Sequence, residues 1–209
     1  MTKDTHIASG LALSVALSQP ETFKTLAICI VGATIGSVIS DIDVTTSKSR
    51  KDLEIIISIS VIAIVLCTIL EAIFHLGILT MLQTQTNLFR IILGFSLFLC
   101  ICCIGINTKH RTFMHSALCV IALTGIVWII IPTASIPFCI AMLSHIFLDF
   151  FNTKRVQIFY PLKKPRIAFK LCHSSSKVSK IIFKITSTVF LLELLVFIIL
   201  YAINFFKNF

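Results

Sequence analysis

The chain alternates between long apolar segments and short polar ones. Six apolar segments carry almost no charge, and the longest exceed the length that a helix needs to cross about 30 Å of hydrocarbon. These are residues 26–39, 55–79, 90–106, 117–131, 138–151 and 185–206. A shorter apolar stretch, residues 7–18, precedes them and reaches only about 18 Å as a helix. The pattern predicts an all-α, polytopic transmembrane helical bundle with about six full spans and a short N-terminal hydrophobic helix.

Small residues recur at intervals of four in the first two apolar stretches. Gly10 and Ser14 show this spacing in the first stretch, and Gly32 and Gly36 show it in the second. Small side chains on one face let two helices approach closely inside a membrane. We therefore expect residues 7–40 to form a tightly packed helical hairpin.

Composition confirms that the chain is not a soluble domain. It is 57% hydrophobic and 13% charged, with a mean hydropathy of +1.01, whereas soluble domains are about half apolar and a quarter charged. The start of the chain lacks a strongly basic region and a clear cleavage site, so we expect the first helix to be retained.

The net charge of +9 is unevenly distributed. Lys and Arg concentrate in residues 41–54, 107–115 and 152–184, whereas the connections at 80–89 and 132–137 have none. We expect residues 132–137, which have a proline at each end, to form a tight turn. The positive-inside rule places the three basic segments, and by parity the N-terminus, in the cytoplasm of a multi-pass cell-membrane protein.

The basic loop 152–184 is expected to contact anionic lipid headgroups. Nucleic-acid binding is the competing interpretation of such a segment, but no known nucleic-acid module surrounds it, so no nucleic-acid partner is predicted. We divide the chain into a transmembrane metal-site domain with this loop, residues 1–184, and a C-terminal transmembrane helix, residues 185–209.

Four polar clusters, distant in sequence, fall at helix ends on the same predicted side of the membrane. They are His6; Asp41 with Asp43; His110, Arg111 and His115; and His145 with Asp149. A random distribution would divide such clusters between the two sides. Their common side therefore indicates one shared site.

Two of the clusters have spacings that suit metal binding. His145 and Asp149 are four residues apart, so they share one helix face; a pair that caps a helix end is the alternative. Asp41 and Asp43 flank one residue, which places both carboxylates on one side of an extended segment. Paired carboxylates need a cation or a proton to offset their repulsion, although two solvated loop acids would have the same sequence.

The third cluster suits a loop rather than a helix. His110 and His115 are five residues apart, too far round for one helix face, and Ser116 is a candidate N-cap for the helix that follows. Arg111 has the fork geometry that binds phosphate or carboxylate. An interfacial basic loop that includes Lys109 is the alternative. His6 is a candidate only because it directly precedes a helix that has small residues along one face.

Imidazole and carboxylate without thiolate favour a divalent ion such as Zn, Mn or Fe over Ca or Mg. The candidate metal ligands are His6, Asp41, Asp43, His110, His115, His145 and Asp149. Seven ligands exceed the need of one tetrahedral ion, so either two ions bind or some residues have other roles. Asp43 or Asp149 is a candidate general base, and Arg111 is a candidate group for holding an anionic leaving group or phosphate.

The order of these motifs resembles a known family. Thr-His-x-x-x-Gly at 5–10, Asp-Ile-Asp at 41–43, His-Arg-x-x-x-His-Ser at 110–116, His-x-x-x-Asp at 145–149 and the segment 152–162 resemble the YdjM-like, predicted membrane-bound metal-dependent hydrolases. The resemblance implies a metal-dependent hydrolase, with Zn or Mn as the favoured ion and no substrate specified.

We therefore predict hydrolysis by a metal-activated water at the cytoplasmic membrane face, on a lipid or a phosphoester, because the site faces the headgroups. A non-enzymatic metal-binding or metal-transporting membrane protein is the alternative. Transport would need polar groups along the spans, which have few apart from Glu71 and Glu193. A lipid phosphatase with Ser-Arg before His-x-x-x-Asp needs a different spacing from that of Ser49-Arg50. Glu193 is an intramembrane acid of unassigned role.

Overall fold

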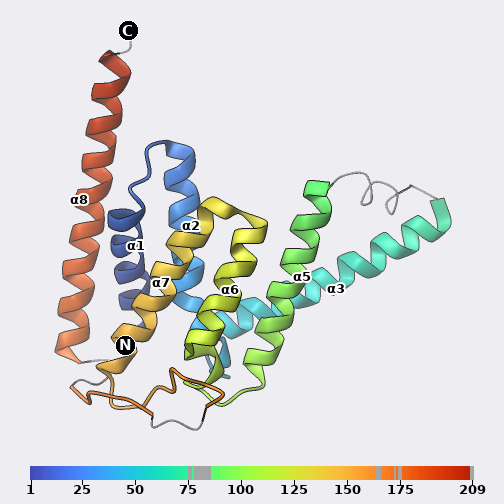
Figure 1. Ribbon diagram of the computed structural model, residues 1–209, viewed down its shortest axis with the longest axis horizontal. Coiled ribbons are helices and arrows are strands. Elements are labelled where there is room, and N and C mark those ends of the chain that lie inside the picture. Colours follow the sequence, from blue (N-terminus) through green and yellow to red (C-terminus); the bar gives the residue numbers. More distant parts are fainter. Residues whose placement is uncertain (75–76, 78–85, 163–165, 172, 174–175, 208–209) are drawn as a thin grey trace.

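The protein is a helical bundle throughout the part of the chain that the computed structural model describes (Figure 1). The described residues are 1–74, 77, 86–162, 166–171, 173 and 176–207. Their α-helices are α1 (Lys3–Ser18), α2 (Phe23–Ile39), α3 (Lys48–Phe74), α5 (Thr86–Ile106), α6 (Ala117–Ile130), α7 (Pro132–Phe150) and α8 (Lys177–Lys207). Two 3₁₀ turns, η1 (Ser40–Asp43) and η2 (Phe113–His115), lie between them.

Five of these helices are long and apolar enough to cross a membrane, as judged by length and composition. They are α2 (with η1), α3, α5, α7 and α8, and α6 is a shorter apolar helix. This confirms the prediction of an all-α membrane bundle. Most side chains of α3 and α8 are exposed and apolar, which is the surface that a span presents to lipid rather than to water.

Helices α1, α2 and α7 pack closely because small residues lie where they meet. A Cβ atom on Gly10 would lie 2.0 Å from Oγ of Ser37, and one on Gly36 would lie 2.4 Å from the carbonyl oxygen of Phe138. Ser14 of α1 donates a hydrogen bond to the carbonyl of Pro137 at 2.9 Å. The small-residue spacing in the sequence therefore marked real helix contacts.

The connection between α6 and α7 differs from the prediction. Residues 132–137 are not a tight turn but the first turns of α7, and Ile131 alone joins the two helices. Pro132 occupies the first helical position, where no backbone N–H is needed and the fixed φ suits the helix. Pro137 also lies inside the helix, where it has no N–H to donate to the carbonyl of Thr133.

Helix α8 begins at Lys177, so the last eight residues of the predicted basic loop are helical. Thr5 and Ser179 join α1 to this start of α8 through their hydroxyl groups, which lie 3.1 Å apart. The division of the chain at residue 184 stays a prediction.

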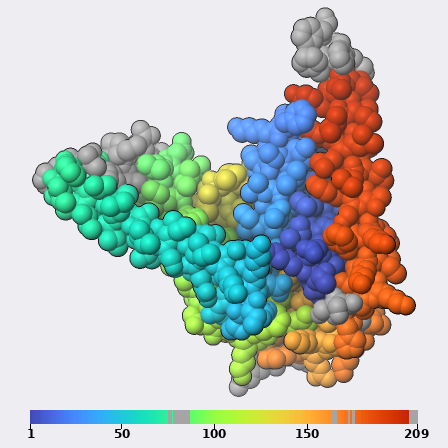
Figure 2. Space-filling model, turned by 180° about the vertical axis from the view of Figure 1, so that it is seen from behind, coloured from blue at the N-terminus to red at the C-terminus, as the bar shows by residue number. Residues whose placement is uncertain are grey.

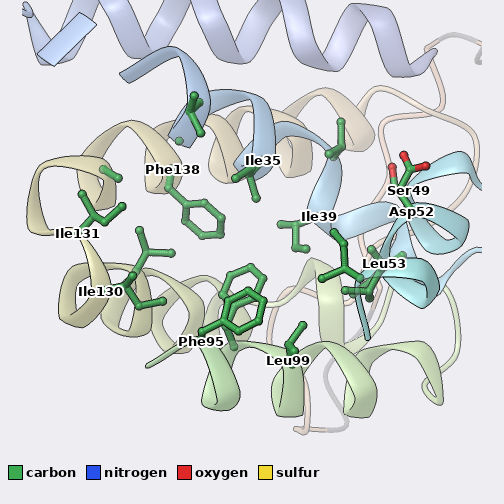
Figure 3. Close-up of a pocket in the computed structure, with 18 of the residues that line it drawn as sticks. Ile35, Ile39, Ser49, Asp52, Leu53, Phe95, Leu99, Ile130, Ile131 and Phe138 are labelled. Atoms are coloured by element: carbon green, nitrogen blue, oxygen red, sulfur yellow. The ribbon is translucent and has the colours of Figure 1, made fainter. Parts of the chain in front are cut away.

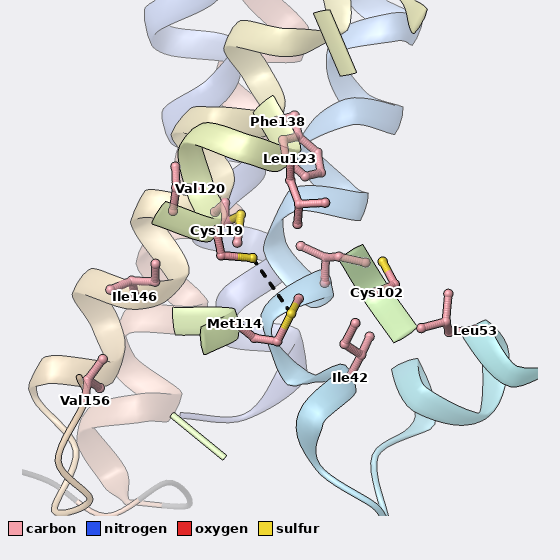
Figure 4. Packing of buried hydrophobic residues seen from close by; sticks show 12 residues of the cluster. Ile42, Leu53, Cys102, Met114, Cys119, Val120, Leu123, Phe138, Ile146 and Val156 are labelled. Atoms are coloured by element: carbon pink, nitrogen blue, oxygen red, sulfur yellow. Dashed lines mark hydrogen bonds between the residues drawn. The ribbon is translucent and has the colours of Figure 1, made fainter. Parts of the chain in front are cut away.

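An apolar core lies between α6, α7 and the two 3₁₀ turns (Figure 4). Met114 of η2, Ile42 of η1 and Leu123 of α6 are almost fully buried in it. The Cys119 thiol contacts the sulfur of Met114 at 3.8 Å. This core holds both turns against the bundle, and both turns carry residues of the polar clusters.

The outer helices give the molecule its outline. Figure 2 shows α8 along one side, with α1 against it, while α3 projects on the other side. Ser49 and Leu53, near the start of α3, are its buried residues. The rest of α3 diverges from the bundle (Figures 1 and 2).

Candidate metal centre

The four polar clusters converge at one end of the bundle. This end, called here the basic end, carries η1, η2 and the described connecting residues 107–112, 151–162 and 166–171, and the N-terminus lies there too (Figure 1). All seven predicted ligands lie in two adjoining groups or directly beside them. The first group is His6, His145 and Asp149, and the second is Asp41, His110 and His115. Within each group one ligand atom per residue lies within 4.8 Å of the others.

The first group is built from α1 and α7. His145 and Asp149 lie one turn apart on α7, and both are buried. His6 comes from the first turn of α1, and its ring stacks on that of His145 with 3.8 Å between the ring centroids. Its Nε2 atom lies 3.6 Å from Oδ1 of Asp149. Burial, and then the neighbouring ring of His145, lower the pKa of His6 well below its ordinary value, which favours a neutral His6 ring with a free lone pair.

The tautomer of His145 follows from a backbone contact. Its Nδ1 atom lies 2.6 Å from the carbonyl oxygen of Ser37, which can only accept a hydrogen bond. Nδ1 therefore carries a proton, and Nε2 is the nitrogen that could bind a metal. That Nε2 atom lies 3.6 Å from Oδ1 of Asp41 and has no hydrogen-bond partner among the described residues. A backbone carbonyl that orients a histidine in this way is typical of metal sites.

The second group contains the two 3₁₀ turns. Asp41 and Asp43 were predicted to lie on an extended segment, but they lie on η1. This tight turn directs the two carboxylates to different neighbours, since Asp41 faces His145 and Asp43 faces the His-Arg motif. Asp43 lies within 2.7 Å of Nδ1 of His110 and within 3.6 Å of Nδ1 of His115.

His115 lies where the two groups meet. Its Nε2 atom is 3.3 Å from Oδ2 of Asp149, and its Nδ1 atom faces Asp43. Neither nitrogen makes a hydrogen bond of good geometry with a described residue. Burial disfavours the imidazolium form, but the carboxylates of Asp149 and Asp43 more than offset this effect, and the pKa of His115 rises to about 9. The surroundings of His115 therefore favour a cation at this position.

Arg111 connects the clusters. Its guanidinium group lies 2.9 Å from Oδ2 of Asp149 and donates to the carbonyl of Lys154 and to Nε2 of His110. Its backbone N–H donates to Oδ2 of Asp43 at 3.0 Å. These contacts accompany a left-handed backbone with φ of 64°, which is uncommon for a residue other than glycine. The segment after α7 fixes this conformation, because Gln157 donates its N–H to the carbonyl of Arg111 at 3.0 Å.

Ser116 caps α6 as the sequence predicted. Its hydroxyl oxygen accepts a hydrogen bond from the backbone N–H of Cys119 at 3.2 Å. Sequence reasoning missed the carbonyl groups of Ser37 and Lys154, which orient His145 and Arg111. The role of the Ser37 carbonyl had one indication in the sequence. Ser37 lies in the last turn of α2, where backbone carbonyls lack helical partners.

The charges and burial of the site fit a divalent cation. Three carboxylates converge there. The described cations that pair with them are Arg111, the amino group of Met1, which lies 3.3 Å from Asp149, and in the metal-free chain the protonated His115, whose proton a metal ion would replace. Four buried ring nitrogens have no hydrogen-bond partner among the described residues: Nδ1 of His6, both nitrogens of His115 and Nε2 of His145. Buried polar atoms normally have partners, so ring nitrogens without partners beside carboxylates are what a site gains when a metal ion displaces the protons from its histidines. His110 and Asp41 form the exposed edge, with about 29% and 28% of their side-chain surfaces accessible.

Comparison with known proteins gives one match. Residues 1–208 match the family model described as YdjM inner membrane protein. No curated protein and no solved structure matches the chain.

Proposed function

We propose that this chain, which belongs to the YdjM inner membrane protein family, is a hydrolase that uses a divalent ion held by its buried His and Asp residues. The observation that carries the proposal is the set of unpaired buried imidazole nitrogens that face three carboxylates. In a purely structural cluster these buried nitrogens would stay without hydrogen-bond partners, which costs free energy.

His6, His145 and Asp149 would hold one ion, and Asp41 and His115 face the space beside it. The mixed imidazole and carboxylate donors favour Zn or Mn. When bound, such an ion supplies a Lewis acid and lowers the pKa of water that it coordinates.

Asp43 is a better general base than Asp149. Asp149 is bound through both carboxylate oxygens to cationic or imidazole groups. Both oxygens of Asp43 also have partners, the backbone N–H of Arg111 and Nδ1 of His110, but the ring of His110 is partly exposed. A proton taken up by this pair therefore has a route to the edge of the site.

Arg111 would act chiefly by holding Asp149 and His110 in place, because its guanidinium contacts both. Its remaining N–H groups are available for an anionic substrate oxygen. A phosphoester or another anionic ester is therefore the substrate class that we propose, presented by a lipid at the membrane surface.

We place the metal centre on the cytoplasmic face. The concentration of Lys and Arg at the basic end supports this orientation, because basic segments beside spans are retained in the cytoplasm. The same charges support contact between the loop 152–184 and anionic headgroups.

Hydrolysis assays on the purified full chain test the proposal. Phosphatidic acid in mixed micelles and p-nitrophenyl phosphate in solution would be supplied before chelation, after chelation and after reloading with Zn or Mn. We expect turnover that chelation abolishes and reloading restores, and that Asp43→Asn removes. The matched control is Glu21→Gln, which changes an exposed acid outside the two ligand groups. Turnover that survives chelation would contradict the proposal, and bound metal without turnover would leave a non-enzymatic metal-binding protein.

A further inference from the structure

A long apolar groove lies beside the metal centre. It has a volume of about 530 Å³ and lies between α2, the start of α3, α5, and the helix ends around the α6–α7 connection. In Figure 3 side chains such as Ile35, Phe95 and Phe138 point into one common space. The volume lies within the range of about 300–1,000 Å³ that is typical of pockets for small molecules.

The shape of the groove suits a chain. Its lining follows α2 from Ala27 to Ile39, which are 12 positions apart, or about 18 Å at the helical rise. Ile130 and Ile131 line one end, and Ser49 and Asp52 line the other (Figure 3).

The surroundings indicate what fills the groove. Most of its lining comes from candidate membrane spans, and the lining is apolar apart from its Ser49–Asp52 end. Side chains along it are accessible from outside, including Val31 at 59% and Ile131 at 45%. Water would find almost no hydrogen-bond partners there, and an empty groove would forfeit dispersion contacts. A hydrocarbon chain from the bilayer satisfies both conditions.

The polar end of the groove is lined by Ser49 and the acid Asp52 and is flanked by basic residues. Lys48, Arg50 and Lys51 occupy the first turn of α3, on either side of the lining residue Ser49. The N-terminus of this long helix adds its own partial positive charge. Arg50 is paired with Glu54 at 2.8 Å, whereas both lysines are exposed. Residues 48–54 contain three basic and two acidic side chains, so this end keeps a small positive excess that favours an anionic headgroup.

The same end adjoins the exposed edge of the metal centre. Ser47 donates from its hydroxyl to the carbonyl of Asp41 at 2.7 Å. Arg50 contacts the carbonyl of Ile106 at 3.4 Å, where α5 ends before the His-Arg motif. Ile42, on η1 between Asp41 and Asp43, lines the groove itself.

We propose that the groove holds one aliphatic chain of an anionic membrane lipid, with the headgroup at the first turn of α3, and that this lipid is the substrate of the metal centre. The identity of the substrate rests on the proposed function, whereas occupation of the groove does not.

Photolabelling separates the two claims. The full chain would be reconstituted in phosphatidylcholine vesicles that contain phosphatidic acid with a diazirine in its acyl chain, and labelled residues would be mapped by mass spectrometry. We expect label to concentrate on the lining segments of α2 and α5. Val31→Trp, which fills the groove, should reduce this label several-fold. Val61→Trp is the matched control, because Val61 is similarly exposed, at 54%, on α3 outside the groove.

Ile131→Trp, at the end of the groove opposite Ser49 and Asp52, repeats the test if Val31→Trp does not fold. A probe with a diacylglycerol head should label the groove less, because it lacks the negative charge. Label that follows exposed apolar surface, with α3 and α8 labelled as strongly as the groove, would show ordinary bilayer contact and overturn the inference. If the groove is labelled but no metal-dependent hydrolysis occurs, the proposed hydrolase function is refuted, whereas lipid binding in the groove is not. If Val31→Trp hydrolyses phosphatidic acid as fast as the wild type, the groove is not the substrate site, whereas the hydrolase function stands.

Discussion

The Nδ1 atom of His145 lies 2.6 Å from the carbonyl oxygen of Ser37, across the interface between α7 and α2. This single contact fixes a proton on Nδ1 and directs Nε2 toward Asp41 and the rest of the site. Helix packing and ligand chemistry are therefore joined at one atom pair.

One substitution of His145 should separate these roles. Asn can keep a donor near the Ser37 carbonyl but has no counterpart of Nε2. We expect His145→Asn to remain folded and to lose metal affinity by more than the roughly 10- to 100-fold that loss of an orienting partner alone costs. Metal titration by calorimetry, with thermal unfolding of the metal-free protein as the folding control, checks this. Wild-type affinity in His145→Asn would show that Nε2 is not a ligand.

Close helix packing should be needed to bring Ser37 to His145. A Cβ on Gly36 would lie 2.4 Å from the backbone carbonyl of Phe138, which cannot move aside cheaply. We expect Gly36→Ala to destabilise the protein by about 1–3 kcal/mol. Gly125→Ala is the matched control, since nothing lies within 4 Å of its Cβ and alanine favours the helix. Thermal unfolding in one detergent compares them, and equal stabilities would contradict the packing assignment.

The metal-free protein should lose stability in mildly alkaline solution. The pKa of His115 is about 9 in the folded chain, against an ordinary value of 6.5. A raised folded pKa contributes stability that is fully present below pH 6.5 and is lost as the pH rises through about 9. We expect the melting temperature of chelated protein to fall over this window.

A bound ion should remove this pH dependence, because it takes the place of the proton beside the carboxylates. Metal binding near pH 7 should accordingly release protons, measurable in a weakly buffered titration. His115→Gln is the control and should abolish the alkaline decline. A decline that persists in His115→Gln would assign it to another group.

Arg111 should not tolerate lysine. Its guanidinium contacts Asp149, the Lys154 carbonyl and His110 at once, whereas an ammonium lacks the fork geometry. We expect Arg111→Lys to cost about 1.5–3 kcal/mol for a lost charged hydrogen bond, seen as a lower melting temperature. Arg155→Lys, at an exposed neighbour, should have little effect. Equal melting temperatures for both variants would refute the connecting role of Arg111.

Several features of the fold and site were predictable from sequence because they depend on residue type and spacing. Apolar length identified the spans, and Gly10 and Gly36 marked helix contacts. Because successive spans alternate in direction, the sequence also predicted that the distant His and Asp residues lie at one end of the bundle. The start of α7 was not predictable, because prolines at 132 and 137 suit either a turn or a first helical turn. The roles of Ser37 and Lys154 depend on backbone carbonyls, which every residue has, so side-chain chemistry could not reveal them.

The division of ligands between two groups was also beyond the sequence. Asp41 and Asp43 have the same spacing in an extended segment and in a 3₁₀ turn, but the turn sends them to different histidines. Tertiary packing of Ile42 into the core selects the turn.

The measurement that tests the central claim most directly is elemental analysis of the detergent-purified protein beside a His115→Ala, Asp149→Ala double variant. We predict stoichiometric metal in the wild type and its loss in the double variant, with circular dichroism showing that both remain helical. Absence of metal from the wild type, even after Zn and Mn are supplied, would contradict the account.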